Sequence, residues 1–174
     1  MACNPLHMFV FRLIYSGSGI LVGILAACVF SGVFHNSHAA CWALASAVLS
    51  IVCMAQYIYL YVIKEKKRRA PSAVVLTIFG MIGALCLGLG GGGFVAYLGL
   101  AITDTLHHIE ISLPASYYVV CVWNFMVCKW GLTIYLYSIV SYKYLKKVPK
   151  GFKPIETDEN EIAADEEVGN DALA

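Results

Sequence analysis

The sequence predicts an all-α membrane protein with four transmembrane helices and with both the N- and C-termini in the cytoplasm. Of the 174 residues, 60% are hydrophobic and only 13% are charged, about half the usual charged share of a soluble domain. The hydrophobic residues form four runs of about 20 or more, which is the length that crosses the hydrocarbon core as a helix. Lys and Arg gather in alternate connections, and this pattern predicts the orientation.

The spans must be helices because lipid cannot satisfy the polar groups of an irregular backbone. We expect them within a four-helix transmembrane domain of residues 1–148, at about residues 13–34, 40–63, 73–102 and 116–141. The remaining segment, 149–174, is acidic and has no hydrophobic periodicity, so it is expected to be a disordered cytoplasmic tail.

The connections predict which ends face the cytoplasm. His35–His38 and Asp104–Ala115 contain no Lys or Arg, whereas Lys64–Arg69 and the segment Lys143–Lys153 are basic. Short basic connections stay in the cytoplasm. The termini and the second loop are therefore expected there, and the first and third loops on the exoplasmic or lumenal side.

Small residues that recur every four positions predict helix contact faces. In the first span the repeat comprises Tyr15, Gly19, Gly23, Ala27 and Ser31. In the third span it comprises Gly80, Ala84, Gly88, Gly92 and Ala96. The run Gly90–Gly93 could also hinge the third span or let a flat ligand lie against the backbone.

Lys129 lies near the middle of the fourth predicted span, where a charged side chain costs at least ~2.5 kcal/mol. No Asp or Glu occurs in the predicted spans, so we expect Lys129 to face the interior and to hold an anionic cargo. A structural lysine solvated by water is the alternative. Asn124 could share this site or only bond between helices.

Histidines and aromatic residues add a second signal. Four of the five histidines belong to the two exoplasmic loops: His35, His38, His107 and His108. Neutral imidazole is a good ligand for iron and other metals. Tyr59, Tyr61, Tyr117 and Tyr137 fit an interfacial belt, whereas Tyr57, Trp123 and Trp130 should lie deeper. A flat metal complex with carboxylates would suit both the histidines and Lys129, and a bare metal ion is the alternative.

Several segments resemble the haem-responsive-gene haem transporters, solute carrier family 48, and look most like the nematode haem-uptake members. The resemblance covers roughly residues 11–145. It is carried by the segments Arg12–Gly17, Leu100–Thr103, Ser116–Tyr118 and Trp123–Trp130.

The resemblance implies haem ligands at particular positions. In the second span Tyr57 matches a ligand position, or Gln56 if the alignment shifts by one residue. In the second exoplasmic loop the match is His107 or His108. After the fourth span, Tyr142-Lys143-Tyr144 stands where the family has the fuller motif Phe-Ala-Arg-Lys-Tyr, and interfacial anchoring is the alternative role of Tyr142 and Tyr144.

The sequence therefore predicts a haem carrier that is not an enzyme, with haem moving from the exoplasmic side into the cytosol. Its partners are haem and the lipid bilayer, with no nucleic acid, and we expect a homo-oligomer such as a dimer because four helices are few to enclose haem. The plasma membrane is favoured over an endosomal or lysosomal membrane. The alternatives are a divalent-metal permease that uses the loop histidines and a non-transporting tetraspan scaffold.

Overall fold

The computed structural model consists of four long helices, and all four are long and apolar enough to cross a membrane. The helices are α1 (Pro5–Gly32), α2 (Ser37–Tyr61), α3 (Ala73–Leu106) and α4 (Tyr117–Lys147). The structure describes residues 5–63, 71–107 and 116–147. Within these ranges there is no β-strand, so the predicted fold class is confirmed.

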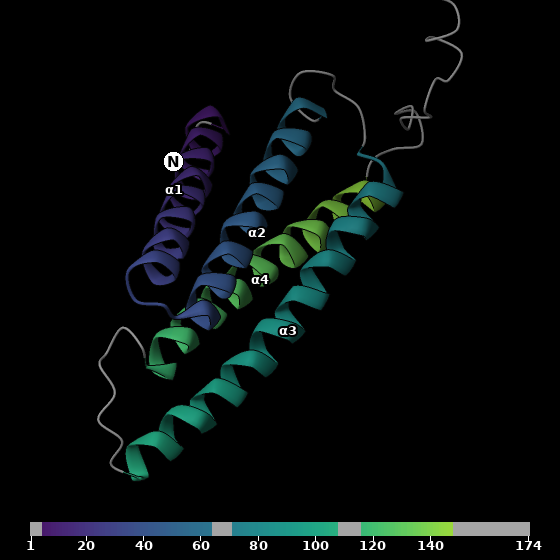
Figure 1. Ribbon diagram of the computed structural model, residues 1–174. Helices are drawn as coiled ribbons and strands as arrows, with labels where there is room; N and C mark the ends of the chain where they lie inside the picture. Colours follow the sequence, from purple (N-terminus) through teal and green to yellow (C-terminus); the bar gives the residue numbers. More distant parts are fainter. Residues whose placement is uncertain (1–4, 64–70, 108–115, 148–174) are drawn as a thin grey trace, which may run out of the picture.

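The helices pack in the order α1, α2, α4, α3 (Figure 1). In the most apolar window of each helix, 50% of the residues of α2 and 44% of those of α4 are buried, against 11% for α1 and 17% for α3. The inner helices are therefore α2 and α4. Consecutive helices run in opposite directions, so the start of α1 and the end of α4 lie at the same end of the molecule (Figure 1).

The helices extend beyond the apolar runs that predicted them. The first begins at Pro5 rather than near residue 13, which brings Arg12 into α1. Proline suits the first turn of a helix because its missing N–H has no helical partner there. The third runs on to Leu106 and includes Asp104, and the fourth runs on to Lys147, because backbone hydrogen bonding does not stop where apolar side chains do.

Close contact between α1 and α2 depends on two glycines. A side chain on Gly23 would bring its Cβ to 2.9 Å from the Ala47 Cβ and 3.0 Å from the Ala43 carbonyl oxygen. On Gly19 it would collide with Trp130 and Ser50. The small-residue face predicted for the first span is therefore confirmed at its centre.

The face predicted for the third span is wrong. Gly88 and Gly92 have open space around them, whereas a Cβ on Gly83 would lie 2.6 Å from the Tyr135 nitrogen and one on Gly90 2.9 Å from the Cys128 nitrogen. A step of seven residues drifts only about 20° around a helix, whereas a step of four drifts about 40°. The seven-residue step from Gly83 to Gly90 therefore keeps both glycines facing α4. The helix is continuous through Gly90–Gly93.

Candidate functional site

Lys129 lies where α4 meets α1, between two aromatic rings. Its Nζ is 4.5 Å from the centroid of the Tyr15 ring and 4.5 Å from that of Trp130. The two rings are 5.3 Å apart. Lys129 is half-buried at the edge of the contact between α1 and α4, while Trp130 is buried. Aromatic faces attract a cation and offset part of its cost in the membrane.

A second cation, Arg12, lies on α1 against tyrosine rings of α2 and α4. Its Cζ is 4.8 Å from the centroid of Tyr137 and 5.8 Å from that of Tyr57. The two tyrosine rings meet edge to face at 4.9 Å. From the sequence, Arg12 was expected before the first span and Tyr137 in the interfacial belt, so the contact between them was not predicted. Arg12 could have been found from its spacing to Tyr15, since residues three apart share one helix face. That spacing gives no information about Tyr137.

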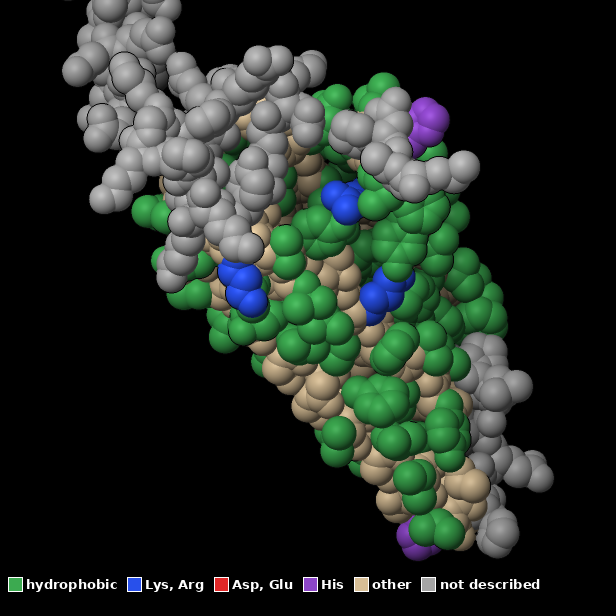
Figure 2. Space-filling view, turned by 180° about the vertical axis from the view of Figure 1, so that it is seen from behind, with side chains coloured by type: hydrophobic (Ala, Val, Ile, Leu, Met, Phe, Trp, Pro, Cys, Tyr) green, Lys and Arg blue, Asp and Glu red, His purple; other side chains and the backbone are tan. Residues whose placement is uncertain are grey.

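We call the six residues of this region the cation–aromatic strip: Arg12, Tyr15, Tyr57, Lys129, Trp130 and Tyr137. Lys and Arg side chains gather on one face in Figure 2, and those that the structure describes are Arg12, Lys129 and Lys143. Among the described residues the only acid is Asp104. It lies about 20 Å of helix beyond Gly90, which packs on Cys128, so it cannot pair with Lys129.

The two alternative ligands of the second span, Tyr57 and Gln56, face different partners. Tyr57 is 5% exposed and lies in the cation–aromatic strip. Gln56 is fully buried, and its Nε2 donates hydrogen bonds to the Ile134 carbonyl at 3.2 Å and to the Ser138 Oγ at 2.9 Å. Gln56 therefore joins α2 to α4, and only Tyr57 lies beside a cation.

Trp123 and Asn124 lie apart from Lys129. Trp123 packs edge to face on Phe30, with ring centroids 6.4 Å apart. Asn124 is buried, its Nδ2 donates to the Val120 carbonyl at 2.9 Å, and its side chain lies where a Cβ on Gly93 would be. Asn124 thus faces α3 while Lys129 faces α1, so the structure does not place Asn124 in the lysine site.

At the end of the bundle opposite the start of α1 and the end of α4, His38 belongs to a cluster of aromatic rings. Its Nδ1 lies 2.9 Å from the Tyr97 hydroxyl, and the rings of Tyr97 and Tyr117 lie 5.7 Å and 6.3 Å from the imidazole. Trp42 packs on Tyr97. The imidazole itself is exposed. Tyr97, which orients His38, was missed because a single tyrosine in a glycine-rich span carries no pattern.

The other loop histidines do not join this cluster in the residues described. His35 is exposed and adopts a φ of 50° at the turn before α2. His107 is the exposed C-cap of α3, about 15 Å of helix beyond Tyr97. His108 lies outside the described residues. Across the described ranges no group of three His, Cys, Asp or Glu side chains could hold a metal ion.

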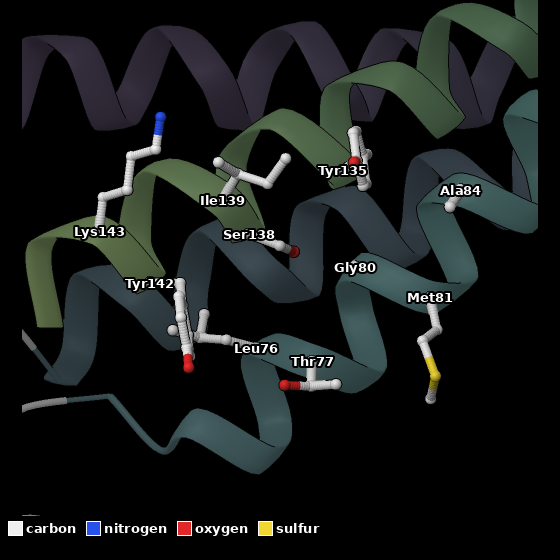
Figure 3. A pocket seen from close by; sticks show the side chains of 10 residues that line it. All are labelled: Leu76, Thr77, Gly80, Met81, Ala84, Tyr135, Ser138, Ile139, Tyr142 and Lys143. Atoms are coloured by element: carbon white, nitrogen blue, oxygen red, sulfur yellow. The ribbon is translucent and has the colours of Figure 1, made fainter. Parts of the chain in front are cut away.

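A pocket of about 450 Å³ opens between the first half of α3 and the last half of α4 (Figure 3). Its lining is mostly apolar and includes Leu76, Met81 and Tyr135. Tyr142 and Lys143 line it where α4 approaches its end, and Figure 3 shows Lys143 pointing away from Tyr142. Tyr144 lies in α4, but its side chain is outside the described part. The volume is in the range of small-molecule sites.

Comparison with known proteins gives one match. A family described as "Haem-transporter, endosomal/lysosomal, haem-responsive gene" matches residues 76–130. The matched segment runs from the pocket residue Leu76 in α3 to Lys129 and Trp130 in α4. No curated protein and no solved structure matches the chain. Over these residues the match confirms the resemblance to the haem-responsive-gene haem transporters; the likeness to the nematode members stays a prediction.

Proposed function

From the match of residues 76–130 to a haem-transporter family, we propose that this chain carries haem across a membrane into the cytosol. The observation that carries the proposal is the Lys129 ammonium held between Tyr15 and Trp130 in the middle of a span. Haem is a flat apolar ring with an iron and two carboxylates. An aromatic surface that holds a cation matches both the ring and an acid group.

The energetics of Lys129 support an anionic cargo. Burying the charge in a span costs at least ~2.5 kcal/mol. Two aromatic contacts offset at least about 1 kcal/mol of that, since each cation–π contact contributes about 0.5 to 2 kcal/mol. No described carboxylate lies near enough to supply the rest. A haem propionate would do so, and the half-buried ammonium is accessible to it from the α1/α4 face (Figure 2).

The proposed direction follows from charge. The basic segments Lys64–Arg69 and Lys143–Lys153 favour a cytoplasmic location for the end that holds both termini. The histidine end is then exoplasmic or lumenal, and His35, His38, His107 and His108 are the candidates to capture haem iron. His38 has the strongest support, because a hydrogen bond to one ring nitrogen orients the other, as in many metal-binding histidines.

After capture, Lys129 neutralises a propionate and Tyr57 receives the iron nearer the cytoplasmic end, with the residues around Tyr142 and Tyr144 favouring release. Tyrosine is a known axial ligand of haem iron. Because the cation–aromatic strip is open on one side, a second copy of the chain would shield it from lipid, which supports a dimer. We place the protein in the plasma membrane, although the family description names endosomal and lysosomal membranes.

Replacing Lys129 tests the proposal. In haem-dependent cells that express the full chain, Lys129→Met should lower the initial uptake of a fluorescent haem analogue about tenfold, since it removes one charge-assisted contact. Lys129→Arg should retain part of the uptake because the charge survives.

The matched control is the amount of protein in the membrane. Lys129→Met should insert as well as the native chain or better, because methionine is cheaper in lipid than an ammonium. Native uptake by a well-inserted Met variant would make Lys129 a structural residue and remove the main support for the proposal.

A further inference from the structure

The cation–aromatic strip contains a second cation whose role haem transport alone does not explain. Arg12 lies inside the apolar helix α1, and its guanidinium rests on the rings of Tyr57 and Tyr137. It is half-buried, and the described residues offer it no carboxylate partner. Arginine in a span is as costly as lysine, so two cations without acids at one helix contact call for a ligand with more than one negative group.

The contacts place both cations along the same boundary. Lys129 of α4 reaches Tyr15 of α1, and Arg12 of α1 reaches Tyr137 of α4. On α1, Arg12 and Tyr15 share a face one turn apart. On α4, Lys129 and Tyr137 are two turns apart, about 12 Å. The two cations therefore lie on neighbouring helices along one stretch of the α1/α4 boundary.

We propose that Arg12 and Lys129 bind the two carboxylates of one planar dianion, so that the strip selects porphyrins with both propionates free. This inference rests on the proposed haem transport and defines the substrate class of the same site. The guanidinium forms paired hydrogen bonds to a carboxylate, and the ammonium acts as a point charge. The rings of Tyr15 and Tyr137 lie beside these cations and are at least partly exposed, so they offer flat apolar surface, whereas those of Trp130 and Tyr57 are buried.

An anionic phospholipid fits this arrangement less well. Its headgroup presents its charge at one point and on a flexible chain. The strip presents two charges at a fixed separation, with aromatic rings next to each of them. A rigid ring that carries two acids on one edge matches that geometry.

Binding to the full chain in nanodiscs of zwitterionic lipid tests the inference. The probes are iron protoporphyrin IX (the diacid), its monomethyl ester (the monoester) and its dimethyl ester (the diester). The native protein should bind the diacid about 100-fold more tightly than the diester, about tenfold for each charge-assisted contact. Arg12→Met should weaken diacid binding about tenfold and leave diester binding unchanged. The double variant Arg12→Met/Lys129→Met should bind diacid and diester alike.

Arg12→Lys is the matched control, because it keeps the charge and should keep most of the preference for the diacid. The monoester should be bound by either single Met variant nearly as well as by the native chain, since one acid can use the remaining cation. A structural role for Arg12 would weaken diacid and diester equally and would overturn the inference. The inference would also be overturned if Arg12→Met kept the native preference for the diacid over the diester. The same holds if anionic lipid competes with the diacid and abolishes that preference.

Transport is measured separately in proteoliposomes. Haem uptake together with an unchanged diacid preference in Arg12→Met would refute the two-point site and leave haem transport standing. Native chain that binds the diacid selectively yet moves no haem would refute transport and leave the two-point site standing.

Discussion

The two sides of α4 pack against their neighbours in opposite ways, one through large side chains and the other through glycine. Toward α1 the helix presents large rings and a cation, with Trp130 against Tyr15 and Lys129 over both rings. Toward α3 it presents Gly131, where an added Cβ would lie 2.7 Å from the Leu87 nitrogen and 3.0 Å from the Gly83 carbonyl oxygen. Trp130 and Gly131 are neighbours in sequence but face different helices. Around Gly83 and Gly131 the two backbones leave no room for a ligand, and the space between α3 and α4 opens at the pocket lined by Leu76 and Tyr142.

The largest expected effect comes from adding bulk on the glycine side. In Gly83→Val the new side chain meets the backbone of Tyr135 and Gly131, which cannot swing away. The free energy of unfolding in detergent should fall by about 3 kcal/mol. Gly88→Val carries the same change in helix propensity into open space and should change the free energy of unfolding by less than about 1 kcal/mol. Equal losses in the two variants would show that α3 and α4 are not in contact through Gly83.

An intermediate effect is expected from removing a ring on the other side. Tyr15→Leu takes away one of the two faces that hold the Lys129 ammonium, so haem uptake should fall about fivefold, equivalent to about 1 kcal/mol. Tyr15→Phe keeps the face and should stay near the native rate. Tyr15 is 40% exposed, so neither change should unfold the protein. If Leu and Phe behave alike in the uptake assay, the ring does not serve the lysine.

The smallest effect is expected from a change in the aromatic cluster around His38, which α3 joins through Tyr97. Tyr97→Phe removes the hydroxyl that bonds to His38 Nδ1, and haem uptake at limiting haem should fall about threefold, in line with one neutral hydrogen bond. Tyr118→Phe is the matched control because the Tyr118 hydroxyl bonds to Thr105 rather than to His38. A loss in both variants would point to general loosening of this end.

The four spans were predictable because apolar length is a property of each segment alone. Lys129 stood out for the same reason, since a charge in the middle of a span is visible without any neighbour. Gly19 and Gly23 were predicted as contact residues because they are the only two glycines of α1 that lie four residues apart. In α3 the glycines are so frequent that more than one repeat fits, and the sequence alone favoured Gly88 and Gly92, which face open space.

The cation–aromatic strip was not predictable in the same way. Whether Arg12 reaches Tyr137, and whether Lys129 reaches Tyr15, depends on how far α1 slides along α4. That register is a tertiary property, because α1 and α4 are far apart in the chain. Arg12 also lies at the margin of its apolar run, where a basic residue is expected outside the membrane. His107, His108 and Tyr144 were named by resemblance, and their proposed roles are still predictions.

The hydrogen bonds of Gln56 have a consequence for how the protein is assembled. Contacts are strongest between α1 and α2 and between α3 and α4, which are two pairs adjacent in sequence. Each pair can form as a helical hairpin when it enters the bilayer, and Gln56 of α2 joins them by donating to Ile134 and Ser138 of α4. Before that docking, Arg12 and Lys129 lie in separate hairpins without each other's rings. An undocked chain therefore leaves Arg12 with the Tyr57 ring and Lys129 with the Trp130 ring, so each cation is more exposed to lipid than in the docked bundle.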